Sequence, residues 1–537
     1  MTIYQVFTRL FGNDKANCIP SGTKQQNGCG LMQDFTAKAL EQIRALGCTH
    51  IWYTGVIEHA SKTGYSALGI PVDNPDVVKG EAGSPYAIRD YYDVDPDLAK
   101  DPSRRIREFE LLVERTHKAG LKVIIDFVPN HVARQYRSDA KPEGVRDLGE
   151  DDDTTLFSSP DNNFYYLSEP LCLNNILPHS TYREVPAKAT GNDRFTAKPS
   201  KDDWYETVKL NYGRNTWHKM LHILLYWASK GIDGFRCDMA EMVPVEFWEW
   251  ALPQVKKTFP DIVFIAEVYN SALYRGYIHR GHFDFLYDKV GLYDTLLRVC
   301  LGQSTQSITA CWQSVDDIRG HMLNFLENHD EQRLASDFLL GRAEKALPAL
   351  LISALMPSPF MLYFGQELGE RGMDAEGFSG RDGRTTIFDY WSVPTIRRWR
   401  NKGRFDGKLL TPEEQSLQKV YQRVLQLREQ SLFAEGGFYD LMYVNPHLHR
   451  QYAFVRHSEL AGKGRRVAFA LIIANFSDKE ETVRLNLPSH LFEHTGICER
   501  AKLVLTDALS GRKTTVPFCS SGPLVVTLPA NFGVVLG

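Results

Sequence analysis

Ionisable residues follow four short apolar runs that have the composition of buried β-strands. These runs are 122–127, 234–237, 263–266 and 322–326, and the residues in or just after them are Asp126, His131, Arg236, Asp238, Glu267, His329 and Asp330. If the runs are parallel strands of one barrel, their carboxyl ends meet at a single mouth, where the active sites of barrels lie. The sequence therefore predicts a polar, ionisable site at that mouth.

Two carboxyl groups at such a mouth can cleave a glycosidic bond. One carboxylate attacks the anomeric carbon and a second, protonated carboxyl group protonates the leaving oxygen; a separation of about 5–5.5 Å gives retention of configuration. Asp238 and Glu267 follow neighbouring strands and are predicted to lie near that spacing. Arg236 lies two residues before Asp238, on the same face of its strand, where a hydrogen bond would keep Asp238 ionised. Four apolar residues precede Glu267, and their burial would raise its pKa toward that of a general acid.

These residues also have structural interpretations. An Asp after a strand commonly caps a helix, and Arg236 with Asp238 could form an ion pair that only supports the barrel. The coincidence of four strand ends, with two histidines and one arginine, favours the functional interpretation.

Apolar runs alternate with stretches of helical period over the first four hundred residues. Strands are predicted at 3–7, 50–53, 122–127, 234–237, 263–266, 283–286, 322–326 and 360–364, and helices at 35–46, 104–119 and 216–230. Gly47, Gly120 and Gly231 stand where a glycine would end each of these helices. The alternation predicts an α/β fold, a (β/α)8 TIM barrel, with a doubly wound sheet as the alternative.

Two segments interrupt the alternation. Residues 132–209 are polar and irregular and predict a small domain inserted after strand 3. From 436 onward, short strands are predicted at 452–456, 467–474, 482–487 and 524–528, which is typical of an all-β sandwich. The predicted domains are a catalytic barrel of 1–131 and 210–435, an inserted domain of 132–209, and a C-terminal β-sandwich domain of 436–537.

The composition excludes several classes of partner. The chain has 62 Lys and Arg against 66 Asp and Glu, a net charge of −4, so neither nucleic acid nor an anionic membrane surface is predicted to bind. Three prolines interrupt the apolar stretch 346–364, which favours a buried helix and strand over a membrane span. The nine dispersed cysteines predict mostly free thiols, and no signal peptide is visible. A cytoplasmic location is predicted, or a periplasmic or extracellular one if a leader was trimmed.

The four strand ends resemble the four signature regions of the α-amylase family (glycoside hydrolase family 13), whose members are retaining, α-glucan-active enzymes. The matching segments are 126–131 (DFVPNH), 234–238 (GFRCD), 265–268 (IAEV) and 328–330 (NHD), in the family's order and spacing. The resemblance implies that Asp238 is the nucleophile, that Glu267 is the general acid/base, and that Asp330 stabilises the transition state.

The resemblance also implies a set of residues that bind the sugar beside the scissile bond. These are Tyr86, His131, Arg236 and His329. Tyr86, in 84–96 (SPYAIRDYYDVDP), matches the tyrosine that stacks on that sugar. An aromatic ring suits the apolar face of a pyranose, although a tyrosine buried for packing alone is the alternative.

The chain departs from the family pattern at positions tied to calcium. Calcium-dependent members commonly carry Lys-His three and four residues after the nucleophile, and the His gives calcium a backbone ligand; here Glu241 and Met242 stand there. Asn130 matches the family's calcium-ligand asparagine but could equally cap a turn. In the fifth family region, where many members have Pro-Asp-Leu-Asn, Lys209 replaces the acid. No cofactor is predicted as required, no metal ligand is assigned, and calcium stays an open alternative.

These inferences combine into one functional prediction. The chain is expected to be a retaining glycoside hydrolase that cleaves α-1,4-glucosidic bonds in starch or maltooligosaccharides through a covalent glucosyl-Asp238 intermediate. The alternative is an oligosaccharide α-glucosidase or a glucanotransferase of the same family, because the acceptor cannot be identified from the sequence. A non-catalytic binding subunit is disfavoured, since Asp238, Glu267 and Asp330 are all present. The sequence leaves the oligomeric state open.

Overall fold

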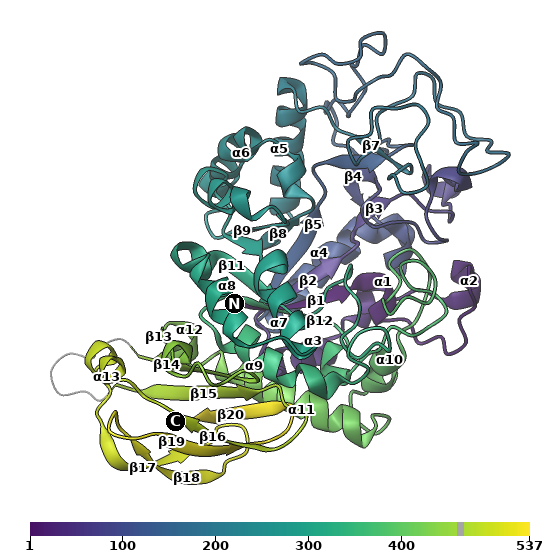
Figure 1. Cartoon of the computed structure of the whole chain (residues 1–537). Coiled ribbons are helices and arrows are strands. Elements are labelled where there is room, and N and C mark those ends of the chain that lie inside the picture. The colour runs from purple at the N-terminus through teal and green to yellow at the C-terminus, as the bar shows by residue number, and fades with distance from the viewer. Residues whose placement is uncertain (459–466) are drawn as a thin grey trace.

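The computed structural model describes residues 1–458 and 467–537, and its centre is a closed barrel of eight parallel strands (Figure 1). Around the barrel the strands follow chain order: β1 (Thr2–Phe7), β2 (His50–Thr54), β5 (Lys122–Phe127), β8 (Gly234–Cys237), β9 (Val263–Ala266), β10 (Phe285–Tyr287), β11 (Met322–Phe325) and β12 (Phe360–Tyr363). All eight predicted strands are present, and the closed barrel rules out the doubly wound sheet.

The predicted sixth strand, 283–286, begins two residues too early. The chain is still turning before β10, because His282 adopts a left-handed conformation with φ of 61°. The Phe283 amide donates to the Tyr277 carbonyl at 3.2 Å instead of to a barrel strand. The extended run therefore starts only at Phe285.

Apolar side chains that point inward fill the barrel. One buried cluster comprises Ile3, Trp52, Ile124, Ile265, Tyr287, Tyr293, Leu323, Phe325 and Met361. On β8 the position beside Ile265 is occupied by Arg236, and Asp126 of β5 lies beside Arg236 on its other side. A buried arginine in this layer needs anionic partners, and Asp126, Asp238 and Glu267 supply them.

Helices connect the strands and cover the outside of the barrel (Figure 1). They are α1 (Thr8–Phe11), α2 (Lys24–Asn27), α3 (Ala37–Ala45), α4 (Arg105–Lys118), α5 (Arg214–Ala228), α6 (Val245–Thr258), α7 (Asp294–Cys300), α8 (Gln306–Gln313), α9 (Leu347–Leu355), α10 (Pro394–Arg400), α11 (Pro412–Leu427) and α12 (Ser431–Ala434). The three predicted helices correspond to α3, α4 and α5, with ends that differ by one or two residues. Gly47, Gly120 and Gly231 have positive φ values, as glycines that end helices do.

The long polar segment leaves the barrel and returns to it at one point. Strand β6 (His131–Ala133) pairs antiparallel with β7 (Thr207–Lys209), so His131 faces Lys209. Between them, residues 134–206 form turns and irregular backbone around a small apolar cluster that includes Leu171, Leu173 and Tyr182. This hairpin lies at the bounds of the predicted insertion, 132–209; the division into domains stays a prediction.

The C-terminal region is rich in strands. A four-stranded antiparallel sheet contains β13 (Gly437–Asp440), β14 (Gln451–His457), β15 (Phe469–Asn475) and β20 (Phe532–Leu536). Two-stranded sheets pair β16 (Glu481–Leu485) with β19 (Leu524–Leu528) and β17 (Arg500–Thr506) with β18 (Lys513–Phe518), and α13 (Ser489–Thr495) follows β16. All four strands predicted here are present, as β14, β15, β16 and β19.

Helix α9 joins the barrel to this region. Every residue of α9 is buried, and the helix contacts β11 of the barrel as well as β15 and β20. The apolar stretch 346–364 is thus a buried helix followed by the buried strand β12, as predicted. Across 1–458 and 467–537, no helix has both the length and the apolar character that crossing a membrane requires.

Candidate active site

Asp238, Glu267 and Asp330 lie at the carboxyl end of the barrel and line one cavity of about 310 Å³. Asp238 directly follows β8 and Glu267 directly follows β9. These strands pair in parallel with Cys237 beside Ala266, so the two acids occupy matched positions on neighbouring strands. Asp330 comes from the loop after β11. The structure therefore brings the three predicted acids to the same cavity.

Arg236 is fully buried and joins two of these acids. Its Nη1 donates to Asp238 Oδ1 at 2.6 Å, and its Nη2 lies 2.8 Å from Glu267 Oε2. Its Nε donates to the Tyr287 hydroxyl at 3.2 Å, while Asp126 Oδ1 lies 3.6 Å from Nη1. One rigid guanidinium thus fixes the relative positions of Asp238 and Glu267 and compensates one negative charge between them.

The surroundings of these two acids shift the pKa of each. Burial raises the pKa of Glu267, and the charge of Asp238 raises it further against the opposing charge of Arg236. Burial also raises the pKa of Asp238, but the charge and the hydrogen bond of Arg236 oppose this rise. Glu267 accepts hydrogen bonds from the Met239 amide (2.8 Å) and the Tyr269 hydroxyl (2.6 Å). Both bonds favour the ionised carboxylate and oppose the rise. The pKa of each acid is raised by burial, and that of Glu267 is raised further by the charge of Asp238.

His329 connects Tyr86 and Asp330. Gln5 Nε2 lies 2.8 Å from His329 Nδ1 and can only donate, so Nε2 carries the proton of the neutral ring. Nε2 lies 2.6 Å from the Tyr86 hydroxyl and 3.1 Å from Asp330 Oδ2. Burial lowers the pKa of His329 well below its usual value. Burial, with the charge of Glu267, raises the pKa of Asp330 to about 8.

His131 enters the cavity wall from β6, and Tyr86 from the segment before β4 (Ile88–Val94). Burial, with the charge of Lys209, lowers the pKa of His131 to about 3, so this ring is neutral as well. Its ring lies against Trp204, with centroids 5.2 Å apart. The ring of Tyr86 stacks on His329, with centroids 5.1 Å apart and an angle of 26°. The cavity thus combines acids with neutral imidazoles and an aromatic face.

Sequence reasoning missed part of the cavity wall. The additional lining residues are Lys79, Ser84, Trp204, Glu206, Thr207, Met239, Tyr269, Phe378, Ile387 and Phe388. Trp204 lies in the irregular insertion and Phe378 in the irregular loop after β12, where no periodicity marks a buried side. Tyr269 could have been found, because it lies two residues after Glu267 and alternation places both on one side of an extended segment.

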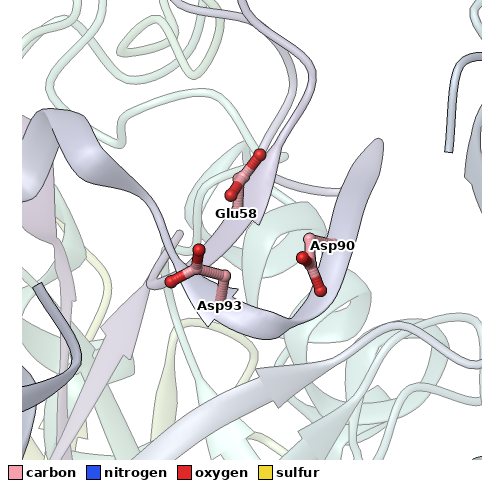
Figure 2. A group of neighbouring side chains, drawn as sticks. All are labelled: Glu58, Asp90 and Asp93. Carbon is pink, nitrogen blue, oxygen red and sulfur yellow. The ribbon is translucent and has the colours of Figure 1, made fainter. Parts of the chain in front are cut away.

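A second group of carboxyl groups, Glu58, Asp90 and Asp93, does not line this cavity. It lies between β3 (Ile57–His59) and β4, with the side chains facing one another (Figure 2). Asp93 is paired with Arg105, and Asp90 accepts four hydrogen bonds. The donors to Asp90 are the Ser138 hydroxyl and the amides of Tyr92, Asp139 and Ala140. Because these oxygens are engaged, the group offers calcium far fewer than the six to eight ligands it takes.

Glu58 is instead held as a neutral acid. Its Oε2 accepts no hydrogen bond, and burial, with the charge of Asp90, raises its pKa from 4.5 to about 9. The unfolded chain ionises this group near pH 4.5 while the folded chain keeps the proton. Stability therefore falls as pH rises from about 4.5 to 9, because the folded state binds more protons in that range.

Glu58→Gln is expected to remove this loss. Glutamine is neutral at every pH. Raising the pH from 5 to 8 should therefore lower the free energy of unfolding of the wild-type protein by roughly 1–3 kcal/mol more than that of the variant. Urea unfolding at both pH values measures this, with the exposed Glu143, changed to Gln, as the matched control. Equal pH slopes for Glu58→Gln and the wild-type protein would show that Glu58 is ionised in the fold.

Comparison with known proteins agrees with this architecture. The sequence profile "Alpha amylase, catalytic domain" matches residues 5–436. "Alpha-amylase 3" of Dictyoglomus thermophilum is 24% identical over 370 residues, covering 64% of this chain and 66% of that protein. "Neopullulanase 2" of Thermoactinomyces vulgaris is 22% identical over 391 residues, covering 69% of this chain and 56% of that protein. The chain thus matches less than two thirds of the length of these relatives.

A solved structure shows the same fold. The "noncanonic maltogenic alpha-amylase AmyB from Thermotoga neapolitana" superposes with a TM-score of 0.62 at 20% identity, covering 100% of this chain and 98% of that one. The family profile covers most of the sequence and includes every strand end that forms the cavity. The chain therefore belongs to the family of alpha-amylase catalytic domains.

Proposed function

We propose that the chain cleaves α-1,4-glucosidic bonds in starch or maltooligosaccharides with retention of configuration. The observation that carries this proposal is the placement of Asp238 and Glu267 directly after neighbouring strands, where both form ion pairs with the guanidinium of Arg236 and both line one cavity. A retaining mechanism needs a carboxylate and a carboxylic acid held at a fixed spacing beside one sugar.

In the first step Glu267 protonates the glycosidic oxygen while Asp238 Oδ attacks the anomeric carbon. The carbon–oxygen bond to the leaving sugar breaks as the ester bond to Asp238 forms, and the proton leaves with the released sugar. In the second step ionised Glu267 takes a proton from water, whose oxygen attacks the same carbon and releases Asp238. The hydrogen bonds from Met239 and Tyr269 to Glu267 keep its carboxyl group oriented through both steps.

The other cavity residues bind the sugar ring in this proposal. His131 and His329 are neutral, so neither brings a competing charge. The Nδ1 atoms lie beside the amides of Asn130 and Gln5, which leaves the Nε2 atoms to contact a sugar hydroxyl. Asp330 contacts two sugar hydroxyls, and its ionised form stabilises the positive charge that develops on the ring. Tyr86 offers its face to the apolar side of the pyranose.

The proposed substrate class rests on the family and on the cavity wall. The names of the similar proteins refer to amylase, neopullulanase and maltogenic amylase. Aromatic side chains in the cavity wall, Trp204, Phe378 and Phe388, suit stacking against further sugar units. An extended glucan therefore fits this cavity better than a lone monosaccharide.

Digestion of maltoheptaose, starch and pullulan tests the proposal. Internal cuts in maltoheptaose and starch, with α-anomeric products in early proton NMR spectra, would support a retaining α-1,4 hydrolase. Release of glucose alone would indicate the oligosaccharide α-glucosidase alternative, and products longer than seven units would indicate a glucanotransferase. β-Anomeric first products, or no cleavage of any glucan, would contradict the proposal.

A further inference from the structure

Lys209, the residue of β7 that faces His131, points its ammonium group into a junction of three chain segments. Its Nζ donates to Asn130 Oδ1 and, at 3.1 Å, to the Met242 carbonyl oxygen. It also lies 2.8 Å from Asp193 Oδ1. Asn130 follows β5, Met242 lies in the loop after β8, and Asp193 belongs to the insertion. One buried cation thus connects the barrel, a loop beside the cavity and the insertion.

The partners of Lys209 match what an ammonium group needs. An ammonium has three N–H donors and no acceptor, and three oxygens surround Nζ. The side chain is 8% exposed, so the group has lost most of its water and depends on these partners. The carboxylate of Asp193 balances its charge, which opposes the fall in the pKa of Lys209 that burial causes.

The oxygens around Lys209 show whether this junction could bind calcium, which the resemblance left open. Asn130 Oδ1 and the Met242 carbonyl occupy the two positions at which family members bind calcium, and both accept from Lys209 instead. Calcium takes six to eight oxygens at about 2.3–2.6 Å; here three oxygens with one formal charge converge, and an ammonium stands among them. The residues of this junction therefore do not fit a bound calcium ion.

We infer that the Lys209 ammonium is the resident cation of this junction, and that it holds the insertion against the barrel without a divalent metal. Asn130 connects Lys209 to the cavity wall, because its Nδ2 donates to the Gly191 carbonyl at 2.8 Å and lies 3.1 Å from His131 Nδ1. Lys209 is thus a positioning residue for the cavity wall.

Thermal unfolding with EDTA or with calcium chloride tests this inference without relying on the reaction. The wild-type midpoint should be the same in both solutions, and calorimetric titration with calcium should show no binding at this junction. Lys209→Met removes the charge at similar volume and should lower the midpoint equally in both solutions. Lys209→Arg keeps the charge and should restore most of the midpoint.

Lys209→Asp tests whether removal of the ammonium creates a calcium site. It adds a second carboxylate beside Asp193, Asn130 and the Met242 carbonyl, so the variant should bind calcium and unfold at a higher temperature in calcium chloride than in EDTA. The exposed Lys201, changed to Asp, is the matched control and should show no calcium response.

The wild-type measurements decide the inference even if Lys209→Asp does not fold. A wild-type midpoint that falls in EDTA and returns with calcium would overturn it, as would stoichiometric calcium binding that Asp193→Asn abolishes. A folded Lys209→Met with an unchanged midpoint would also overturn it, because the ammonium would then hold nothing together.

Discussion

Asp238→Asn is expected to lower the hydrolysis of maltoheptaose by roughly 10⁴-fold or more, the scale of loss seen when an enzyme loses its nucleophile. Asparagine has the size of aspartate, and its Oδ1 can still accept from Arg236 Nη1, so the fold should survive. The amide cannot form the ester bond to the anomeric carbon. Steady-state kinetics on maltoheptaose, with thermal unfolding as the check on folding, measure the effect.

Asp126→Asn is the matched control for this substitution. Asp126 lies 3.6 Å from the same guanidinium and accepts from Trp52 Nε1 at 3.0 Å, but it does not line the cavity. Its replacement also removes one carboxylate near Arg236, yet it should cost far less activity. Equal losses for both variants would mean that Asp238 acts only through the position of Arg236, as a structural ion pair would.

The barrel could be predicted from the sequence because its strands carry two signals at once. Each strand is a short apolar run, and the runs at 234–237 and 263–266 end directly at Asp238 and Glu267. Burial on both faces accounts for the apolar run, and the cavity accounts for the polar residue at its end. In the sixth strand Asp284 interrupts the apolar run 283–286, and there the predicted start differs from that of β10 by two residues.

The cavity wall could be predicted only where it follows a strand. Trp204 and Phe388 reach the cavity from irregular backbone, and their places depend on contacts with segments far apart in the chain. The role of Lys209 was also hidden, because a lysine in a loop normally points to solvent. Its burial follows from the hairpin of β6 and β7, which places it beside Asn130 and Met242.

The hydrogen bonds of Asp238 do not support the interpretation that it caps a helix. Asp238 accepts from the Arg236 side chain, and among the bonds of the described residues no backbone amide donates to it. The amide of Met239, the residue after Asp238, donates to Glu267. The ion pair with Arg236 exists, but Asp238 also faces the cavity, so supporting the barrel does not account for its position.

Glu267→Gln should give a loss that depends on the leaving group. Glutamine keeps the shape of the protonated acid and can still accept from Tyr269, but it has no proton to give to a sugar oxygen. Hydrolysis of maltoheptaose should therefore fall by roughly 10³–10⁴-fold. An α-maltosyl fluoride has a leaving group that departs without protonation, so its first step should be slowed much less.

Hydrolysis of the covalent intermediate, the second step, distinguishes the role of Glu267 from that of Asp238. Without the carboxylate of Glu267 no base activates water, so the fluoride should give a burst of released fluoride and a covalent maltosyl-protein visible by mass spectrometry. Azide is an anion that needs no base, and it should restore turnover of Glu267→Gln and yield a maltosyl azide. Asp238→Asn should show neither the burst nor the rescue, because it forms no ester. Equal losses on maltoheptaose and on the fluoride would mean that Glu267 is not the proton donor, since the acid is required only for the leaving group that must be protonated.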